Sequence, residues 1–202
     1  MNTANFPTYL LGPRRDKQGP RPLVGNHVGV DKSATGRLFR CKINTPVSTF
    51  NIRLLNCIEM IGELTALAEE KGISVVCLQE HRKFHDSAHV HYTVVGKGRI
   101  LANSSCWKKS MNSCVEGVGM LLSLSAHNSL EGNIVVVNSR IIVANFSGNP
   151  ATTIICCYSP LNCSGDSDAL DFYNTRSEVI KRQPGHNLKI TCGDIWMHKP
   201  VP

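Results

Sequence analysis

Between residues 48 and 78, the hydrophobic pattern predicts a strand, a helix and a second strand. Residues 48–53 form a short strand-like segment, and residues 73–78 form an apolar run typical of a buried strand. The predicted helix starts after a suitable N-cap at Asn56 and ends at Gly72, and its apolar residues recur at helical spacing: Ile58, Ile61, Leu64 and Leu67. This order of elements indicates a layered α/β fold.

The chain beyond residue 90 is rich in predicted strands. We expect strands near residues 92–95, 118–122, 133–137, 140–146 and 152–158, with a hairpin turn at Asn138-Ser139. A second helix is expected from Ser167 to about Arg182, followed by a strand over residues 188–192 that leads into Gly193-Asp194.

Residues 1–47 differ in character from the rest of the chain. They contain proline, glycine and charged residues without hydrophobic periodicity, which predicts a disordered leader before a domain over residues 48–202. Most of the net charge of +7 lies in this part, because residues 1–50 hold eight Lys or Arg and two Asp. Such a basic leader suits binding to a polyanion, but it equally suits a solvated tail.

Composition excludes several classes of protein. No apolar run approaches the roughly 20 residues of a membrane span, so we expect no membrane partner. The start of the chain lacks the pattern of a signal peptide, and the nine cysteines contain no C-x-x-C pair. These features predict a nuclear or cytoplasmic protein with reduced thiols rather than a secreted one. No pattern points to a protein partner.

Four polar residues fall at or just beyond the ends of predicted strands: Asn51, Glu80, Tyr158 and Asp194. Strand ends converge in layered α/β folds, so these side chains can line one cleft. A carboxylate and an amide oxygen suit Mg²⁺, which assigns Glu80 and Asn51 to a metal. Asp194 can act as a base toward water, and the Tyr158 hydroxyl and Asn51 amide can donate to a phosphate.

The segments around these residues resemble the successive motifs of the endonuclease/exonuclease/phosphatase superfamily: Phe50-Asn51-Ile52-Arg53, Cys77-Leu78-Gln79-Glu80-His81, Cys157-Tyr158-Ser159-Pro160 and Gly193-Asp194. They are most similar to the apurinic-endonuclease-like domain of non-LTR retrotransposons and their domesticated relatives. The resemblance implies a four-layer α/β sandwich and a phosphodiesterase that uses Mg²⁺ or Mn²⁺ and acts on DNA or RNA. By position, Glu80 matches the metal-binding glutamate, Asn51 the asparagine near metal and phosphate, Tyr158 the phosphate-contacting tyrosine and Asp194 the aspartate that orients water.

The sequence departs from the family pattern in three places. Trp196 occupies the position of an asparagine that helps to hold the phosphate, and Leu161 occupies a position that is often polar. The family's later Ser-Asp-His element has no counterpart before Pro202, so we expect an incomplete, C-terminally truncated domain. The alternative to an impaired nuclease is therefore a non-catalytic retroelement remnant that binds nucleic acid. A phosphatase acting on lipid or inositol substrates is disfavoured by the short loops.

The histidines at positions 81, 85 and 89 have the spacing of ligands on one helix face. However, this segment follows a strand and contains Asp86-Ser87, so a loop is favoured and a zinc site is not.

We predict that the purified chain nicks plasmid or abasic DNA with Mg²⁺ no faster than an Asp194→Ala control. The loss of one preorganised donor, as at Trp196, typically lowers turnover by roughly a hundredfold to a thousandfold. The Ser-Asp-His groups would act together with the residues present, so their absence alone removes most activity. Robust nicking that disappears in the Asp194→Ala control would contradict this prediction.

Overall fold

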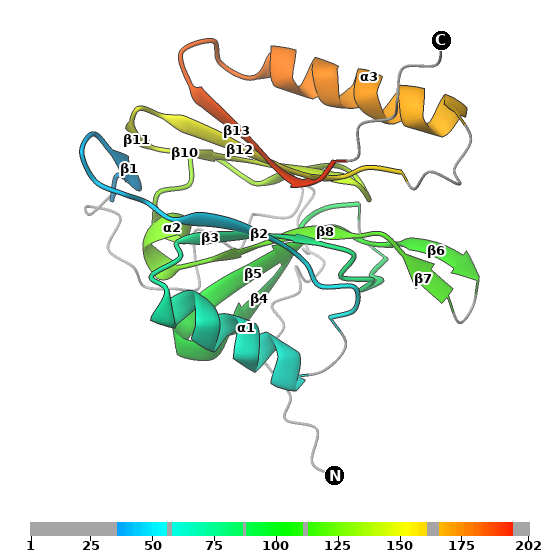
Figure 1. Ribbon diagram of the computed structural model, residues 1–202, viewed down its shortest axis with the longest axis horizontal. Coiled ribbons are helices and arrows are strands. Elements are labelled where there is room, and N and C mark those ends of the chain that lie inside the picture. Colours follow the sequence, from blue (N-terminus) through cyan, green and yellow to red (C-terminus); the bar gives the residue numbers. More distant parts are fainter. Residues whose placement is uncertain (1–35, 56–57, 87, 111–112, 161–165, 196–202) are drawn as a thin grey trace, which may run out of the picture.

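The computed structural model describes residues 36–55, 58–86, 88–110, 113–160 and 166–195. Two β-sheets lie face to face, and one long helix covers the outer face of each sheet (Figure 1). The order of layers is helix, sheet, sheet and helix, which confirms the expected α/β sandwich. Within the described residues, no helix has the length and apolar character needed to cross a membrane.

The first sheet contains five strands in the order β2-β3-β8-β5-β4: Val47–Asn51, Val75–Gln79, Val118–Leu122, Arg99–Asn103 and His91–Val95. Strands β2 and β3 are parallel, and the connection between them contains α1 (Ile58–Glu70). Ile61 and Ala68 of this helix pack on Val76 and Leu78 of β3. Gly72 has a φ of +62° directly after α1, which confirms the predicted helix end.

The second sheet contains four strands in the order β13-β12-β10-β9: Leu188–Asp194, Thr152–Tyr158, Ile141–Phe146 and Val135–Asn138. Strands β12 and β13 are parallel, and α3 (Asp166–Arg182) lies in the connection between them. Phe172 and Val179 of α3 pack on Ile155 and Cys157 of β12. Each sheet therefore contains two parallel neighbouring strands that are connected through a helix on its outer face.

The main hydrophobic core lies between the two sheets. Alternate residues of β3, including Val75 and Cys77, face alternate residues of β12, including Ile154 and Cys156. The intervening residues of both strands face the helices, so β3 and β12 are buried throughout. This burial on both faces explains their nearly continuous apolar sequences.

The described chain begins before the expected domain start at Ser48. Residues 36–46 are described, and they include the short strand β1 (Phe39–Arg40), which pairs with β11 (Gly148–Asn149). Phe39 is buried against Phe146, with ring centroids 6.1 Å apart. The prediction of disorder up to residue 47 is therefore wrong for its last part, because Phe39 and its neighbour Leu38 pack on the core without any hydrophobic periodicity. Residues 1–35 and the predicted N-cap Asn56 lie outside the described residues.

Several elements lack a clear hydrophobic period in the sequence. The sequence analysis did not predict β5, the hairpin of β6 (Trp107–Ser110) and β7 (Ser113–Val115), α2 (Leu124–Asn128) or the short helical turn η2 (Gly96–Gly98). The predicted turn at Asn138-Ser139 lies one residue later, at Ser139-Arg140. Asn138 remains in β9 and its Oδ1 accepts a hydrogen bond of 2.9 Å from the backbone N–H of Arg140, which stabilises the turn.

Gly193 allows β12 and β13 to approach closely at the end of the second sheet. A Cβ at this position would lie 1.7 Å from the carbonyl oxygen of Cys157, and its φ of +143° is one that other residues rarely adopt. The glycine before Asp194 is thus required by packing as well as by backbone geometry.

We predict that Gly193→Ala lowers the free energy of unfolding by about 3 kcal/mol, because β13 must move away from β12. Gly62→Ala is the matched control, since Gly62 lies within α1 and a Cβ there meets no atom within 4 Å. Alanine at position 62 should raise stability by about 0.5–1 kcal/mol. Chemical denaturation measures both values, and equal effects of the two substitutions would contradict the packing argument.

Candidate active site

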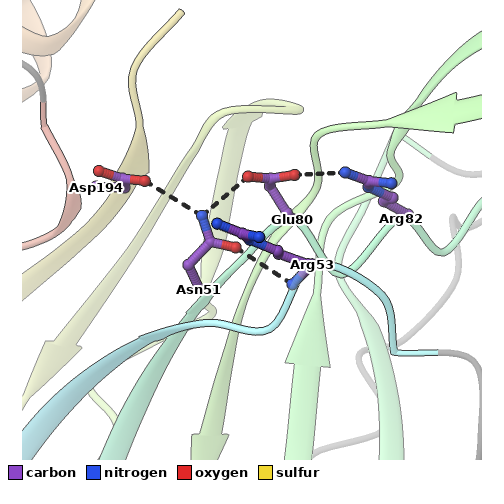
Figure 2. A network of polar contacts seen from close by, with 5 residues as sticks. All are labelled: Asn51, Arg53, Glu80, Arg82 and Asp194. Atoms are coloured by element: carbon purple, nitrogen blue, oxygen red, sulfur yellow. Dashed lines mark hydrogen bonds and ion pairs between the residues drawn. The ribbon is translucent and has the colours of Figure 1, made fainter. Parts of the chain in front are cut away.

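The four residues singled out at strand ends lie together at one end of the two facing sheets. Asn51 ends β2 and Glu80 follows β3, whereas Tyr158 and Asp194 end β12 and β13. The Asn51 Nδ2 donates hydrogen bonds to Glu80 Oε1 at 2.9 Å and to Asp194 Oδ2 at 3.2 Å (Figure 2). The side chain of Asn51 thus joins the first sheet to the second, and two carboxylates face one amide group.

The other end of the Asn51 amide is also held. Its Oδ1 accepts a hydrogen bond of 3.2 Å from the backbone N–H of Arg53 (Figure 2). This contact fixes the amide so that the NH₂ group faces Glu80 and Asp194. The reverse orientation would place an oxygen against two carboxylates, which is unfavourable.

Glu80 is held as a charged carboxylate. Burial raises its pKa, but hydrogen bonds from Asn51, Arg82 and Tyr158 outweigh burial and bring the pKa below the ordinary value. Arg82 forms an ion pair with Glu80 Oε2 at 2.7 Å, while Asn51 occupies Oε1. Both carboxylate oxygens therefore have a donor, and Glu80 is ionised at neutral pH.

Tyr158 contributes a protonated phenol. Burial and the negative charge of Glu80 raise the pKa of Tyr158 to about 12, so its hydroxyl stays protonated at neutral pH and can donate to the Glu80 carboxylate. The Arg140 guanidinium lies over the Tyr158 ring, with its Cζ 5.4 Å from the ring centroid. This phenol is a donor directed into a site that already contains two acidic side chains.

The backbone around the site adopts an unusual conformation. Among the described residues, six that are not glycine have positive φ, and four of these lie at the site: Arg53, Glu80, Arg82 and Glu116. Their φ values lie between +53° and +70°, and such conformations cost about 1–3 kcal/mol each. Strained residues of this kind gather at functional sites because the surrounding structure holds them in place.

His81 is part of what holds this backbone. It is fully buried, its Nδ1 accepts a hydrogen bond of 3.0 Å from the Lys83 N–H, and its Nε2 lies 3.2 Å from the Val118 carbonyl. A Cβ at Gly117 would lie 2.5 Å from the ring, so the glycine leaves room for the imidazole. His81 therefore shapes the loop that carries Glu80 and Arg82.

The other histidines of this segment do not form a metal centre. The segment is a loop, as predicted, and His85 stacks near His91 with ring centroids 5.1 Å apart. Within the described part of the chain, no group of three or more His, Cys, Asp or Glu side chains could hold a metal ion.

The site contains residues that the sequence analysis did not assign to it. Arg82 and Glu116 belong to no pattern noted in the sequence, and Arg140 was noted only as the start of an expected strand. Gln79 is buried and its amide connects the sheets below the site, bonding to Thr49 Oγ1 at 3.1 Å and to Cys156 Sγ at 3.3 Å. Gln79 and Arg82 lie one and two residues from Glu80 in the sequence, and this proximity is the signal that could have assigned them to the site. Trp196 and Leu161 lie outside the described residues.

The oxygen-rich set of side chains fits a hard divalent cation. Magnesium is commonly held by one or two carboxylates, with water and substrate phosphate completing its shell. Glu80 and Asp194 supply two carboxylates within hydrogen-bonding distance of one amide group, and Tyr158 adds a third side chain with an oxygen. The carboxylate of Glu80 is already ionised, as a metal ligand must be.

We predict that His81 makes stability depend on pH. Burial lowers the pKa of His81 from 6.5 to about 4 in the folded protein, so the unfolded chain binds more protons between these values. The free energy of unfolding should therefore fall by up to about 3 kcal/mol as pH drops from about 6.5 to about 4. Chemical denaturation across this range should show a smaller loss for His81→Gln than for the exposed control His186→Gln. Identical pH profiles for both variants would contradict the assignment.

Comparison with known proteins reveals a likeness in structure but not in sequence. No protein-family model matches the chain, and no curated protein sequence is significantly similar to it. The crystal structure of an AP endonuclease from Leishmania major aligns with 72% of this chain at a TM-score of 0.53 and 16% sequence identity. The alignment covers 53% of that protein, so this chain spans about half of its length. At this identity the likeness establishes the fold: the described residues adopt an AP endonuclease-like α/β arrangement.

Proposed function

We propose that this domain is a nuclease-type phosphodiesterase domain that binds a divalent cation, Mg²⁺ or Mn²⁺, together with a phosphodiester of DNA or RNA. The proposal includes impaired turnover. The observation that carries it is the hydrogen-bonded set of Asn51, Glu80 and Asp194, with the Tyr158 hydroxyl on Glu80. The AP endonuclease-like fold supports the same class of function.

The residues divide into ligands, donors and a base. Glu80 would hold the cation, and Asn51 would add its Oδ1 as a ligand if the amide turns when the cation replaces its NH₂ group beside the carboxylates; the cation would stabilise negative charge on the phosphate oxygens. The protonated Tyr158 hydroxyl and the Asn51 Nδ2 can donate to those oxygens, since both already donate to carboxylates. Asp194 has a carboxylate that can accept a proton from an attacking water. These roles explain why the site combines acids with fixed donors.

The residue at position 196 supports the proposal that turnover is reduced. The resembled family places an asparagine there as a phosphate donor, whereas this chain has Trp196. An indole is larger and offers one N–H with no acceptor, so it cannot replace a side-chain amide. This substitution also supports the second candidate function, in which the domain binds nucleic acid without cleaving it. The motifs further suggest an origin shared with non-LTR retrotransposon domains. The pattern of the cysteines and the start of the chain suggest a nuclear or cytoplasmic location.

We predict that Mn²⁺ binds the full chain and that Glu80→Gln weakens this binding by at least about tenfold. The substitution removes the charge that the cation needs while keeping the shape of the side chain. Glu131→Gln is the matched control, because Glu131 is exposed and lies outside the site. Calorimetry can measure the affinity, and electron paramagnetic resonance can measure free Mn²⁺ during the titration.

Binding of an oligonucleotide in the same experiment tests the second half of the proposal. Mn²⁺ should strengthen the affinity of the wild-type chain for DNA or RNA, and Glu80→Gln should remove this gain. Equal Mn²⁺ affinities for Glu80→Gln and Glu131→Gln would overturn the metal assignment. Affinity for nucleic acid that does not respond to Mn²⁺ would favour the non-catalytic binding module.

A further inference from the structure

Arg140 contacts Tyr158 in three ways. It lies in the turn between β9 and β10, where its carbonyl accepts a hydrogen bond of 3.0 Å from the Tyr158 N–H. Its Nη1 donates to the Tyr158 carbonyl at 3.4 Å, and its guanidinium covers the aromatic ring. The planar guanidinium can stack on a ring and donate hydrogen bonds at the same time, which a lysine ammonium cannot do as well.

Glu116 fixes the guanidinium in this position. Its Oε1 forms an ion pair with Arg140 Nη2 at 2.7 Å, and its Oε2 accepts a hydrogen bond from the Ser139 hydroxyl. The side chains are largely buried, with 14% of Glu116 and 22% of Arg140 exposed. With Glu116 as its counter-ion, Arg140 is held over the ring and is not free to move to the Glu80 carboxylate.

The same residues close a ring of contacts around the site. The Glu116 carbonyl accepts a hydrogen bond of 3.0 Å from the Arg82 N–H, and Arg82 is paired with Glu80. The pKa values of Glu80 and Tyr158 are shifted by each other, and Arg140 is stacked on the Tyr158 ring. Glu116 has a φ of +70°, so the residue that links Arg82 to Arg140 has a strained backbone conformation.

We propose that the Glu116–Arg140 pair is a positioning device that holds the ring of Tyr158 and aims its hydroxyl into the site. This inference rests on the proposed function, in which Tyr158 donates to a phosphate. A cation on Glu80 would compete with the Tyr158 hydroxyl for that carboxylate. The contacts from Arg140 do not involve Glu80, so they hold the phenol while that carboxylate binds a cation. Arg140 acts through Tyr158 rather than on substrate.

Fluorine NMR of the full chain labelled with 3-fluorotyrosine tests this role without requiring activity. The resonance of residue 158, assigned from Tyr158→Phe, should shift and broaden in both Arg140→Met and Glu116→Gln, and Arg140→Lys should restore it in part. Tyr92 and Tyr173 lie away from this pair and serve as internal markers that each variant is folded. Arg99→Met is the matched control, because Arg99 is also a buried arginine in an ion pair, with Glu69 of α1. It should leave the signal of residue 158 unchanged.

A double-mutant cycle distinguishes positioning of Tyr158 from a role in which the Glu116–Arg140 pair only holds two loops together. Arg140→Met should weaken oligonucleotide binding about tenfold in the wild-type background and have little effect in the Tyr158→Phe background. An unchanged residue 158 signal in folded Arg140→Met or Glu116→Gln would overturn the proposal, and so would an equal loss of affinity in both backgrounds. If the wild-type chain binds no oligonucleotide, the proposed function fails, and the fluorine signal alone still decides whether the pair positions Tyr158. Glu116→Gln retains shape, so it gives this answer even if Arg140→Met does not fold.

Discussion

The candidate site depends on one side-chain amide, that of Asn51, because it connects the ends of the two sheets at the point where the acidic side chains meet. Its NH₂ group lies between the carboxylates of Glu80 and Asp194, and its oxygen is held by the Arg53 N–H. Two carboxylates that converge without a donor or cation between them repel each other. The amide offers two donors at this point, so it keeps the acids close and ready for a cation.

The fold brings these groups together through a repeated arrangement. Each sheet contributes a pair of parallel strands, β2 with β3 and β12 with β13, joined through a helix on the outer face. The site residues lie at the carboxyl ends of these pairs, where the chain leaves the buried part of each strand. Close approach of β12 and β13 at Gly193 keeps Asp194 in register with Tyr158. The spacing between the acids therefore follows from backbone packing as much as from their own hydrogen bonds.

The sequence alone predicted β3, β8 and β12, which are buried on both faces and have nearly continuous apolar runs, and it placed four polar residues at strand ends. It could not predict that Phe39 anchors the segment before β2, because one aromatic residue has no periodicity. Strand β5 includes Arg99, which is buried only through its pairing with Glu69, a contact distant in sequence. The partnership of Glu116 with Arg140 likewise joins two turns that are far apart in the chain, and local patterns contain no signal for it.

The positive φ angles at Arg53, Glu80, Arg82 and Glu116 raise the backbone conformational energy at this end of the molecule. Such conformations persist only where other contacts over-determine them, and those contacts are present here. His81 is buried beneath the loop and bonds to backbone groups on both sides, and the N–H groups of His81 and Arg82 bond to the carbonyls of Gly117 and Glu116. The rigid, buried part of the fold thus maintains a strained loop at its edge. Because the loop is held from below, Glu80 and Arg82 can face the site in a fixed geometry before any ligand arrives, which reduces the ordering cost of binding.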